Sequence, residues 1–221
     1  MLIIDTSSEK LKVILDKNNQ IFINNDNGSK HLQHLLPEID NVLKASGLTL
    51  KEVNTFCVVS GPGSFTGVRI GVSTVKAFCM AMPDKKIVSI NMFDLLSYSI
   101  FSKLQIKTKI AIIIKSTSTK YYFALVSSTG IIEQMKLLNN EEIAKEVIKN
   151  NAILFCYNQQ YEYQNLKATK ITLINEDYLN YVRLKINNQN FVKVQDLKPL
   201  YLALSQAEEE LLKKASANAK S

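Results

Sequence analysis

Arginine and histidine are scarce in this chain of 221 residues, which has only Arg69, Arg183, His31 and His34. Arginine is the usual residue for two-point contacts with phosphate, and the lysines that supply most of the positive charge are scattered among many asparagines. A bias toward lysine and asparagine therefore explains the net charge of +7 about as well as RNA binding does. The charge alone is weak support for a nucleic-acid partner.

Cysteine is also sparse, and no long apolar run is present. Cys57, Cys79 and Cys156 lie far apart in apolar surroundings, which predicts reduced core residues and excludes a disulfide framework or a zinc site. No apolar run approaches the roughly 20 residues of a membrane span, and residues 1–5 turn acidic too soon for a signal peptide. We therefore expect a cytoplasmic protein without a membrane partner.

The residue patterns that commonly carry catalysis are missing. The chain has no paired carboxylate motif, no Gly-x-Ser-x-Gly nucleophile elbow and no cysteine with a credible histidine partner. One helical face could present His31 and His34 to a metal ion, but no Glu-x-x-His arrangement or nearby carboxylate cluster completes a site. We expect neither a metal site nor an enzyme active site on this chain.

The most informative stretch, residues 56–82, reads as a strand, a glycine-rich turn and a helix. A short apolar run bounded by glycine and proline predicts a buried strand, and the helical segment after the turn ends before Pro83. The turn holds Gly61, Gly63 and Gly67, which let a second surface approach the main chain closely.

Phosphate binding at this turn is physically open, because Ser64 or Thr66 could cap a helix whose N-terminal N–H groups favour an anion. Known phosphate loops fit badly, since no Gly-Lys-Ser/Thr follows Gly61 and the glycine spacing is one residue longer than the dinucleotide fingerprint. The next strand-like run ends at Asn91, where a dinucleotide fold needs an acid. The candidate phosphate or nucleotide loop comprises Asp5, Thr6, Gly61, Gly63, Ser64 and Thr66.

Past the turn, one side of the helix is small, with Gly67 and Gly71 four residues apart and Ser73, Thr74 and Ala77 following. Glycine inside a helix costs about 1 kcal/mol relative to alanine. Two explanations stay open at this point. The small side packs closely against the protein's own sheet, or a helix of a partner lies against it.

The run GPGSFTGVRIG from Gly61 to Gly71 closely resembles the signature of the TsaB-like (YeaZ) proteins of bacterial tRNA threonylcarbamoyladenosine biosynthesis, once grouped with glycoprotease-like proteins. Two further stretches are similar to that family. One is His31 followed by Leu35-Leu36-Pro37, and the other is Pro199-x-Tyr201-Leu202.

Two positions depart from the family pattern. Lys115-Ser116-Thr117 stands where relatives usually carry Asp-Ala-Arg, and Ala203 stands where arginine is usual. In actin-like ATPases the first loop also carries a glycine after the acid, and none follows Asp5 here.

The resemblance implies an α/β chain with a two-domain actin-like fold, a duplicated ribonuclease H-like unit with mixed sheets flanked by helices. The residue pattern agrees in outline, because three strand-like runs joined by tight turns open each half. We place an N-terminal domain at residues 1–106 and a smaller C-terminal domain at 107–221, and leave open that the tail from about 199 packs back on the first domain.

Three local expectations complete the outline. Leucines and isoleucines from residue 29 onward predict an amphipathic helix ending near Gly47, which begins near Leu36 or bends there because Pro37 fits a helix interior badly. Residues 158–170 are polar and aromatic, which predicts a surface loop. Residues 177–186 are expected to be helical, with Tyr178, Tyr181 and Val182 on the inner side, and 206–221 to form a charged helix with a frayed tail.

The resemblance further implies a non-catalytic scaffold subunit. It would bind and activate the paralogous TsaD transferase, with the TsaE ATPase as a third partner and tRNA reached only indirectly. No cofactor is expected on this chain, with ATP or ADP at the subunit interface left open, and the chain alone is expected to form a homodimer because an exposed apolar patch seeks burial. The expected partner-binding residues are His31, Leu35, Leu36, Ile39, Gly67, Ile70, Gly71, Thr74, Val75 and Phe78.

Two other classes stay open. A nucleotide-binding phosphotransferase or ATPase of actin-like fold would need Asp5, Thr6 and the Gly61 turn to hold ATP and magnesium. A metallopeptidase is suggested only by the older family label and by His31 and His34.

Overall fold

The structure is a computed structural model that describes residues 1–26 and 31–202. The expected charged helix at 206–221 and the departure at Ala203 lie outside the described residues. Among the helices of the described ranges, none is long and apolar enough to cross a membrane.

The first half of the chain builds a five-stranded mixed sheet. Strands β1 (Leu2–Asp5), β2 (Leu11–Lys17) and β3 (Gln20–Asp26) form the expected antiparallel meander, and β4 (Thr55–Gly61) and β5 (Lys86–Asn91) continue the sheet parallel to β1. The strand order is β3-β2-β1-β4-β5. Because β1 and β4 are parallel neighbours, the loops that follow both strands meet at one edge of the sheet.

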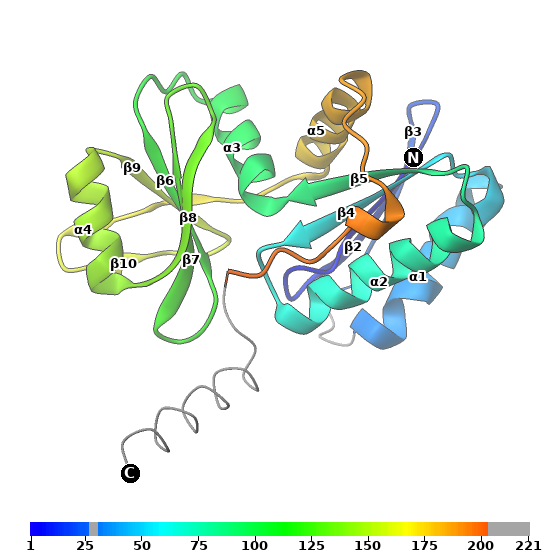
Figure 1. The fold of residues 1–221 in the computed structure, drawn as a ribbon, viewed down its shortest axis with the longest axis horizontal. Coiled ribbons are helices and arrows are strands. Elements are labelled where there is room, and N and C mark those ends of the chain that lie inside the picture. The colour runs from blue at the N-terminus through cyan, green and yellow to red at the C-terminus, as the bar shows by residue number, and fades with distance from the viewer. Residues whose placement is uncertain (27–30, 203–221) are drawn as a thin grey trace, which may run out of the picture.

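Two helical layers cover this sheet, as Figure 1 shows. Helices α1 (His31–Ser46) and α2 (Phe65–Ala81) cover one face, and α3 (Met92–Lys103) and α5 (Asn175–Asn187) lie beyond the other. Alternate strand residues feed the two cores, so Leu2 and Ile4 pack with α1 and α2, whereas Ile3 belongs to the cluster of α3 and α5. The short 3₁₀ helices are Leu50–Glu52 and Val194–Asp196.

The second sheet repeats the first. It contains β6 (Ile110–Lys115), β7 (Lys120–Val126), β8 (Ile132–Asn139), β9 (Ile153–Tyr157) and β12 (Thr169–Ile171), in the order β12-β9-β6-β7-β8. As in the first sheet, an antiparallel meander is followed by two strands parallel to its first strand. Helix α4 (Asn140–Asn150) covers one face, and β10 (Glu162–Tyr163) pairs with β11 (Leu166–Lys167) in a small hairpin.

The repeated strand order confirms the expected α/β actin-like fold of two related units. Helix α3 joins them, because its buried residues share one apolar cluster with Ile3 of the first sheet and Ile112 of the second. After the second sheet the chain returns to the first at α5, and the Val192 N–H donates to the Ile87 carbonyl at 2.9 Å. The domain boundaries at residues 106 and 107 stay a prediction.

The helix expected from residue 29 onward is present as α1, which begins at His31 and includes Pro37. Of the two alternatives at Pro37, a start near Leu36 is wrong, because His31 and Leu35 are already part of the helix and buried against the sheet. Residues 158–170 are more than a surface loop, because they form the β10–β11 hairpin and begin the edge strand β12. Tyr161 within them is buried and packs edge-on against Tyr121, with ring centroids 5.2 Å apart.

Candidate functional site

The glycine turn lies directly against the loop after β1. The Thr6 hydroxyl donates to the Gly67 carbonyl at 2.7 Å, and the Ser64 N–H donates to the Ser7 carbonyl at 2.7 Å. Ser64 caps α2, since its Oγ accepts from the Gly67 N–H at 3.2 Å. The two loops expected to hold a phosphate therefore bond to each other.

The turn glycines are explained by this contact. A Cβ added at Gly63 would collide with the Ser7 carbonyl, and one at Gly67 would collide with the Thr6 carbonyl. Gly71 lies further along α2, and a Cβ added there would collide with the Thr6 hydroxyl. Of the two explanations for the small side of this helix, close packing within the chain accounts for both Gly67 and Gly71.

The Asp5 carboxylate is buried, with 2% of the residue exposed, and both its oxygens have protein partners. Oδ1 accepts from the Ser7 N–H at 2.8 Å and from the Ser7 hydroxyl at 2.6 Å, and Oδ2 accepts from the Tyr178 hydroxyl at 2.6 Å. Burial and the Asp5 charge raise the pKa of Tyr178 well above its ordinary value. The Asp5 carboxylate, which would be needed to hold magnesium and a nucleotide, is thus already hydrogen-bonded to the protein itself.

A C-terminal segment covers the turn from outside. The Leu200 N–H donates to the Ser60 carbonyl at 2.7 Å, and the Leu200 carbonyl lies against Gly61, whose φ of +113° favours glycine. The Tyr201 hydroxyl accepts from Nε of Arg69 at 2.7 Å, and the Arg69 guanidinium stacks 3.9 Å from the Phe65 ring centroid. This segment fills the approach to the Gly61 end of the turn.

The predicted phosphate-loop residues are therefore brought together but mostly closed off. Asp5, Thr6 and Gly61 are buried and Gly63 is half-buried, whereas Ser64 and Thr66 are exposed at the start of α2. In the second sheet, Lys115 ends β6 and the Thr117 hydroxyl accepts from the Lys120 N–H at 3.1 Å, which closes a tight turn.

The predicted partner-binding residues divide into two groups. Six of them are buried within the chain: His31, Leu35, Ile39, Gly67, Gly71 and Val75. His31 donates from Nε2 to the Ser8 carbonyl at 2.6 Å, which gives it a structural role beside the β1 loop. The other four reach the surface: Leu36 is exposed, and Ile70, Thr74 and Phe78 are half-buried.

The partner-binding residues predicted from the sequence omit two exposed residues on the same helices. Leu32 is 76% exposed on α1 and Met80 is 71% exposed on α2. Leu32 lies four residues before Leu36, so both point to one side of α1. That spacing was visible in the sequence, but a helix with apolar residues on several sides does not reveal which side faces its own sheet.

Tyr178 was expected only as an inner residue of its helix, and its bond to Asp5 was not foreseen. The two residues are 173 positions apart, and no sequence signal joins them. The pairing of Arg69 with Tyr201 was missed for the same reason.

The fold and this closed loop define a protein of the two-domain actin-like class in which the usual phosphate-loop positions bond to one another. A family model described as TsaD, tRNA N6-adenosine threonylcarbamoyltransferase, matches residues 23–193. Since the match covers well over half of the chain, the chain belongs to this family.

The curated relatives point more narrowly within it. The chain is 25% identical over 219 residues to the tRNA threonylcarbamoyladenosine biosynthesis protein TsaB of Haemophilus influenzae, a match that covers 91% of this chain and 92% of that protein. It is 33% identical over 81 residues to the Escherichia coli TsaB, covering 36% of this chain and 35% of that protein. The resemblance to TsaB-like proteins is confirmed.

A solved structure supports the fold. YeaZ from Pseudomonas aeruginosa superposes with a TM-score of 0.69 at 20% identity, over 91% of this chain and 98% of that one. A second Pseudomonas aeruginosa structure, described as similar to peptidase YEAZ, gives a TM-score of 0.72 at 21% identity with the same coverage.

Proposed function

We propose that this chain acts in tRNA threonylcarbamoyladenosine biosynthesis as a subunit without a catalytic site of its own, which binds the TsaD transferase and supports its activity. Membership of the family and the end-to-end match to a TsaB protein support the pathway. The observation that carries the proposed mode of action is the apolar outer side of α1 and α2.

Helices α1 and α2 lie side by side on one face of the first sheet (Figure 1) and contact each other. Their outer sides expose Leu32, Leu36 and Met80, three large apolar side chains that gain nothing from contact with water. Burying them against two matching helices of a paralogue would remove this surface from solvent. The same side would support a homodimer when TsaD is absent.

The lack of a catalytic site is supported by the closed loop. Asp5 accepts three hydrogen bonds from protein donors, and the turn glycines touch the Thr6 and Ser7 carbonyls, where a phosphate would need open N–H groups. ATP or ADP would then have to bind between subunits and not in the cleft of this chain. The metallopeptidase alternative has no support from His31, whose Nε2 donates to a carbonyl.

The test uses substitutions on the outer side of α1. Leu36→Glu places a charge on the proposed interface and should weaken binding to the TsaD of the same organism at least about a hundred-fold, since a buried unpaired charge costs several kcal/mol. Ile148→Glu on α4 is the matched control, because Ile148 is 75% exposed away from α1 and α2. Substituting Gly71 would not test the interface, because its surroundings belong to the chain's own core.

Binding would be measured by titration calorimetry, and function by tRNA modification in a mixture that also contains TsaE. Modification should require this chain and should fall with Leu36→Glu but not with Ile148→Glu. Equal binding of both variants would refute the assigned face, and modification without this chain would refute the scaffold role. Binding of magnesium and ATP by the isolated chain would instead favour the phosphotransferase alternative.

A further inference from the structure

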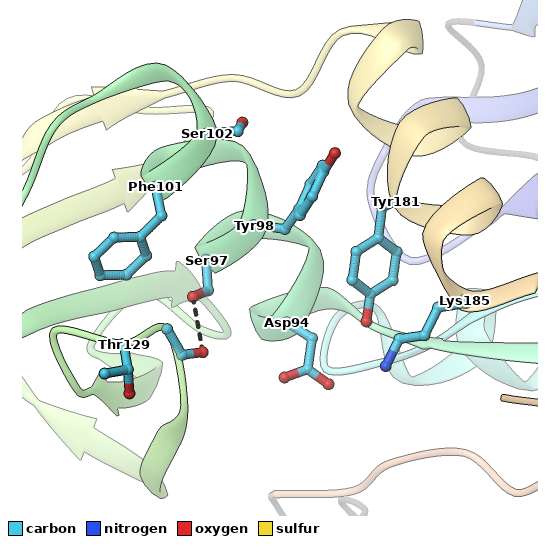
Figure 2. A pocket seen from close by; sticks show the side chains of 9 residues that line it. Asp94, Ser97, Tyr98, Phe101, Ser102, Thr129, Tyr181 and Lys185 are labelled. Atoms are coloured by element: carbon cyan, nitrogen blue, oxygen red, sulfur yellow. Dashed lines mark hydrogen bonds between the residues drawn. The ribbon is translucent and has the colours of Figure 1, made fainter. Parts of the chain in front are cut away.

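A cavity of about 340 Å³ lies between α3, α5 and the turn that joins β7 to β8, as Figure 2 shows. Its lining helices, α3 and α5, lie beyond the face of the first sheet opposite to the one that α1 and α2 cover. It is separate from the partner face and from the closed loop at Asp5. Nothing in the proposed function uses it.

Three polar groups converge at one side of this cavity. In Figure 2 the hydroxyl of Tyr181, the Lys185 amine and the Asp94 carboxylate point toward one another, the first two from α5 and the last from α3. Tyr181 is only 4% exposed, and its buried hydroxyl has no hydrogen-bond partner among residues 1–26 and 31–202. A buried hydroxyl without a partner costs about 1–3 kcal/mol, so natural proteins rarely leave one unused.

Asp94 is half-buried in the first turn of α3, and no other residue in the described part of the chain gives its carboxylate a hydrogen bond or an ion pair. Burial raises its pKa, and the charge of Lys185 opposes that rise. The Lys185 amine lies 5.2 Å from the centroid of the Tyr181 ring. Two opposite charges on different helices therefore face one cavity without touching each other.

Two serine hydroxyls in the remaining walls are already bonded to backbone carbonyls. Ser97 donates to the Gly130 carbonyl at 3.3 Å, and Ser102 donates to the Ser99 carbonyl at 3.1 Å. Aromatic side chains form much of the rest: Phe101 lines the cavity, and the ring centroids of Tyr98 and Tyr181 are 5.6 Å apart. Such a site favours a ligand with two opposite charges and an apolar part.

We propose that this cavity binds a small zwitterion of the amino-acid class. Its ammonium group would pair with Asp94, its carboxylate would accept from Lys185 and Tyr181, and its apolar side chain would lie against Tyr98 and Phe101. A simple cation would be repelled by Lys185, and a simple anion by Asp94. Only a molecule that carries both charges satisfies the three groups together.

L-Phenylalanine is a suitable probe, because two near-isosteric analogues each lack one charge. Titration calorimetry with the full chain at pH 7 should show saturable binding of L-phenylalanine. Binding of 3-phenylpropanoate, which lacks the ammonium group, and of 2-phenylethylamine, which lacks the carboxylate, should be at least about ten-fold weaker. Equal binding of all three compounds, or no saturable binding of L-phenylalanine up to about 10 mM, would overturn the proposal.

Substitutions of the lining residues test whether L-phenylalanine binds in this cavity. Asp94→Asn and Lys185→Met should each weaken binding of L-phenylalanine at least about ten-fold, and Tyr181→Phe should weaken it several-fold. Glu141→Gln and Lys149→Met are matched controls, because both residues are exposed on α4, away from the cavity. Circular dichroism would first establish that each variant is folded. Unchanged binding in Asp94→Asn and Lys185→Met would contradict the site.

The same variants separate this inference from the proposed function. Asp94→Asn and Lys185→Met leave the outer side of α1 and α2 intact, so both should bind TsaD as the unsubstituted chain does. Leu36→Glu should lose TsaD and keep L-phenylalanine. Loss of L-phenylalanine from Leu36→Glu would contradict the independence of the two surfaces.

Discussion

Helix α5 carries two buried tyrosines three residues apart, and each faces an aspartate from another element. Tyr178 donates to Asp5 at 2.6 Å, and the remaining Asp5 oxygen is bonded to Ser7. Tyr181 faces Asp94 across a cavity, and its hydroxyl has no hydrogen-bond partner in the described ranges. A tyrosine and an aspartate therefore form a fully hydrogen-bonded buried pair at Asp5, and line an open polar cavity at Asp94.

The difference comes from the neighbours and not from the pairs themselves. At Asp5 both carboxylate oxygens accept hydrogen bonds from Ser7 and Tyr178, so the acid is used by the fold. At Asp94 the nearby hydroxyls of Ser97 and Ser102 are turned to backbone carbonyls, which leaves the charged groups for a ligand. Polar groups that the fold leaves without a partner remain available to a ligand.

The largest expected effect is a loss of stability at the contact between the glycine turn and the loop after β1. Gly67→Ala would drive a Cβ into the Thr6 carbonyl, and neither backbone segment can yield without breaking the hydrogen bonds between the loops. We expect the free energy of unfolding to fall by about 3 kcal/mol. Urea denaturation measures this, with Ser73→Ala on the exposed side of α2 as a control expected to change it by less than about 0.5 kcal/mol.

A pair of matched substitutions compares the two tyrosines directly. Tyr178→Phe removes a donor to a buried carboxylate and should cost about 2 kcal/mol of unfolding free energy. Tyr181→Phe removes a hydroxyl that has no partner within the described chain, so it should be neutral or slightly stabilising. Equal costs for the two substitutions would show that the two sites do not differ as described.

The smallest expected effect is the pH dependence of stability that Asp94 contributes at the cavity. Because burial raises the pKa of Asp94 in the folded chain, the protonated form is favoured there, and stability is lost as pH rises through the folded pKa. Asp94→Asn should therefore raise the free energy of unfolding at pH 7 in the absence of ligand, with a smaller gain near pH 4. Thermal melts at both pH values test the sign, and a loss of stability at pH 7 would contradict it.

Much of the architecture was predictable because short-range patterns specify it. Apolar runs and tight turns located the meander of each half, and the inward side of α5 was placed correctly at Tyr178, Tyr181 and Val182. Ser64 was foreseen as one of two possible helix caps. The edge strand β12 was missed, because three residues with little apolar character carry almost no strand signal by themselves.

The candidate site was harder to predict, because it depends on which side of each helix meets the sheet. Leu35 and Leu36 are adjacent and chemically identical, yet one is buried and the other is exposed. Gly71 suggested a partner, and the structure gives it a close contact with Thr6 of the same chain. Neither outcome follows from residue type or spacing.

The sequence by itself determined the family, most of the strands and helices in their order, and the existence of a glycine turn, because these depend on residues close together in the chain. Only the tertiary structure decided that the turn is filled by its own loop, that Asp5 is held by Tyr178 from 173 residues away, and that Asp94 and Lys185 share a cavity. The physical reason is that burial and hydrogen bonding between distant segments decide whether a polar group is used by the fold or left for a ligand.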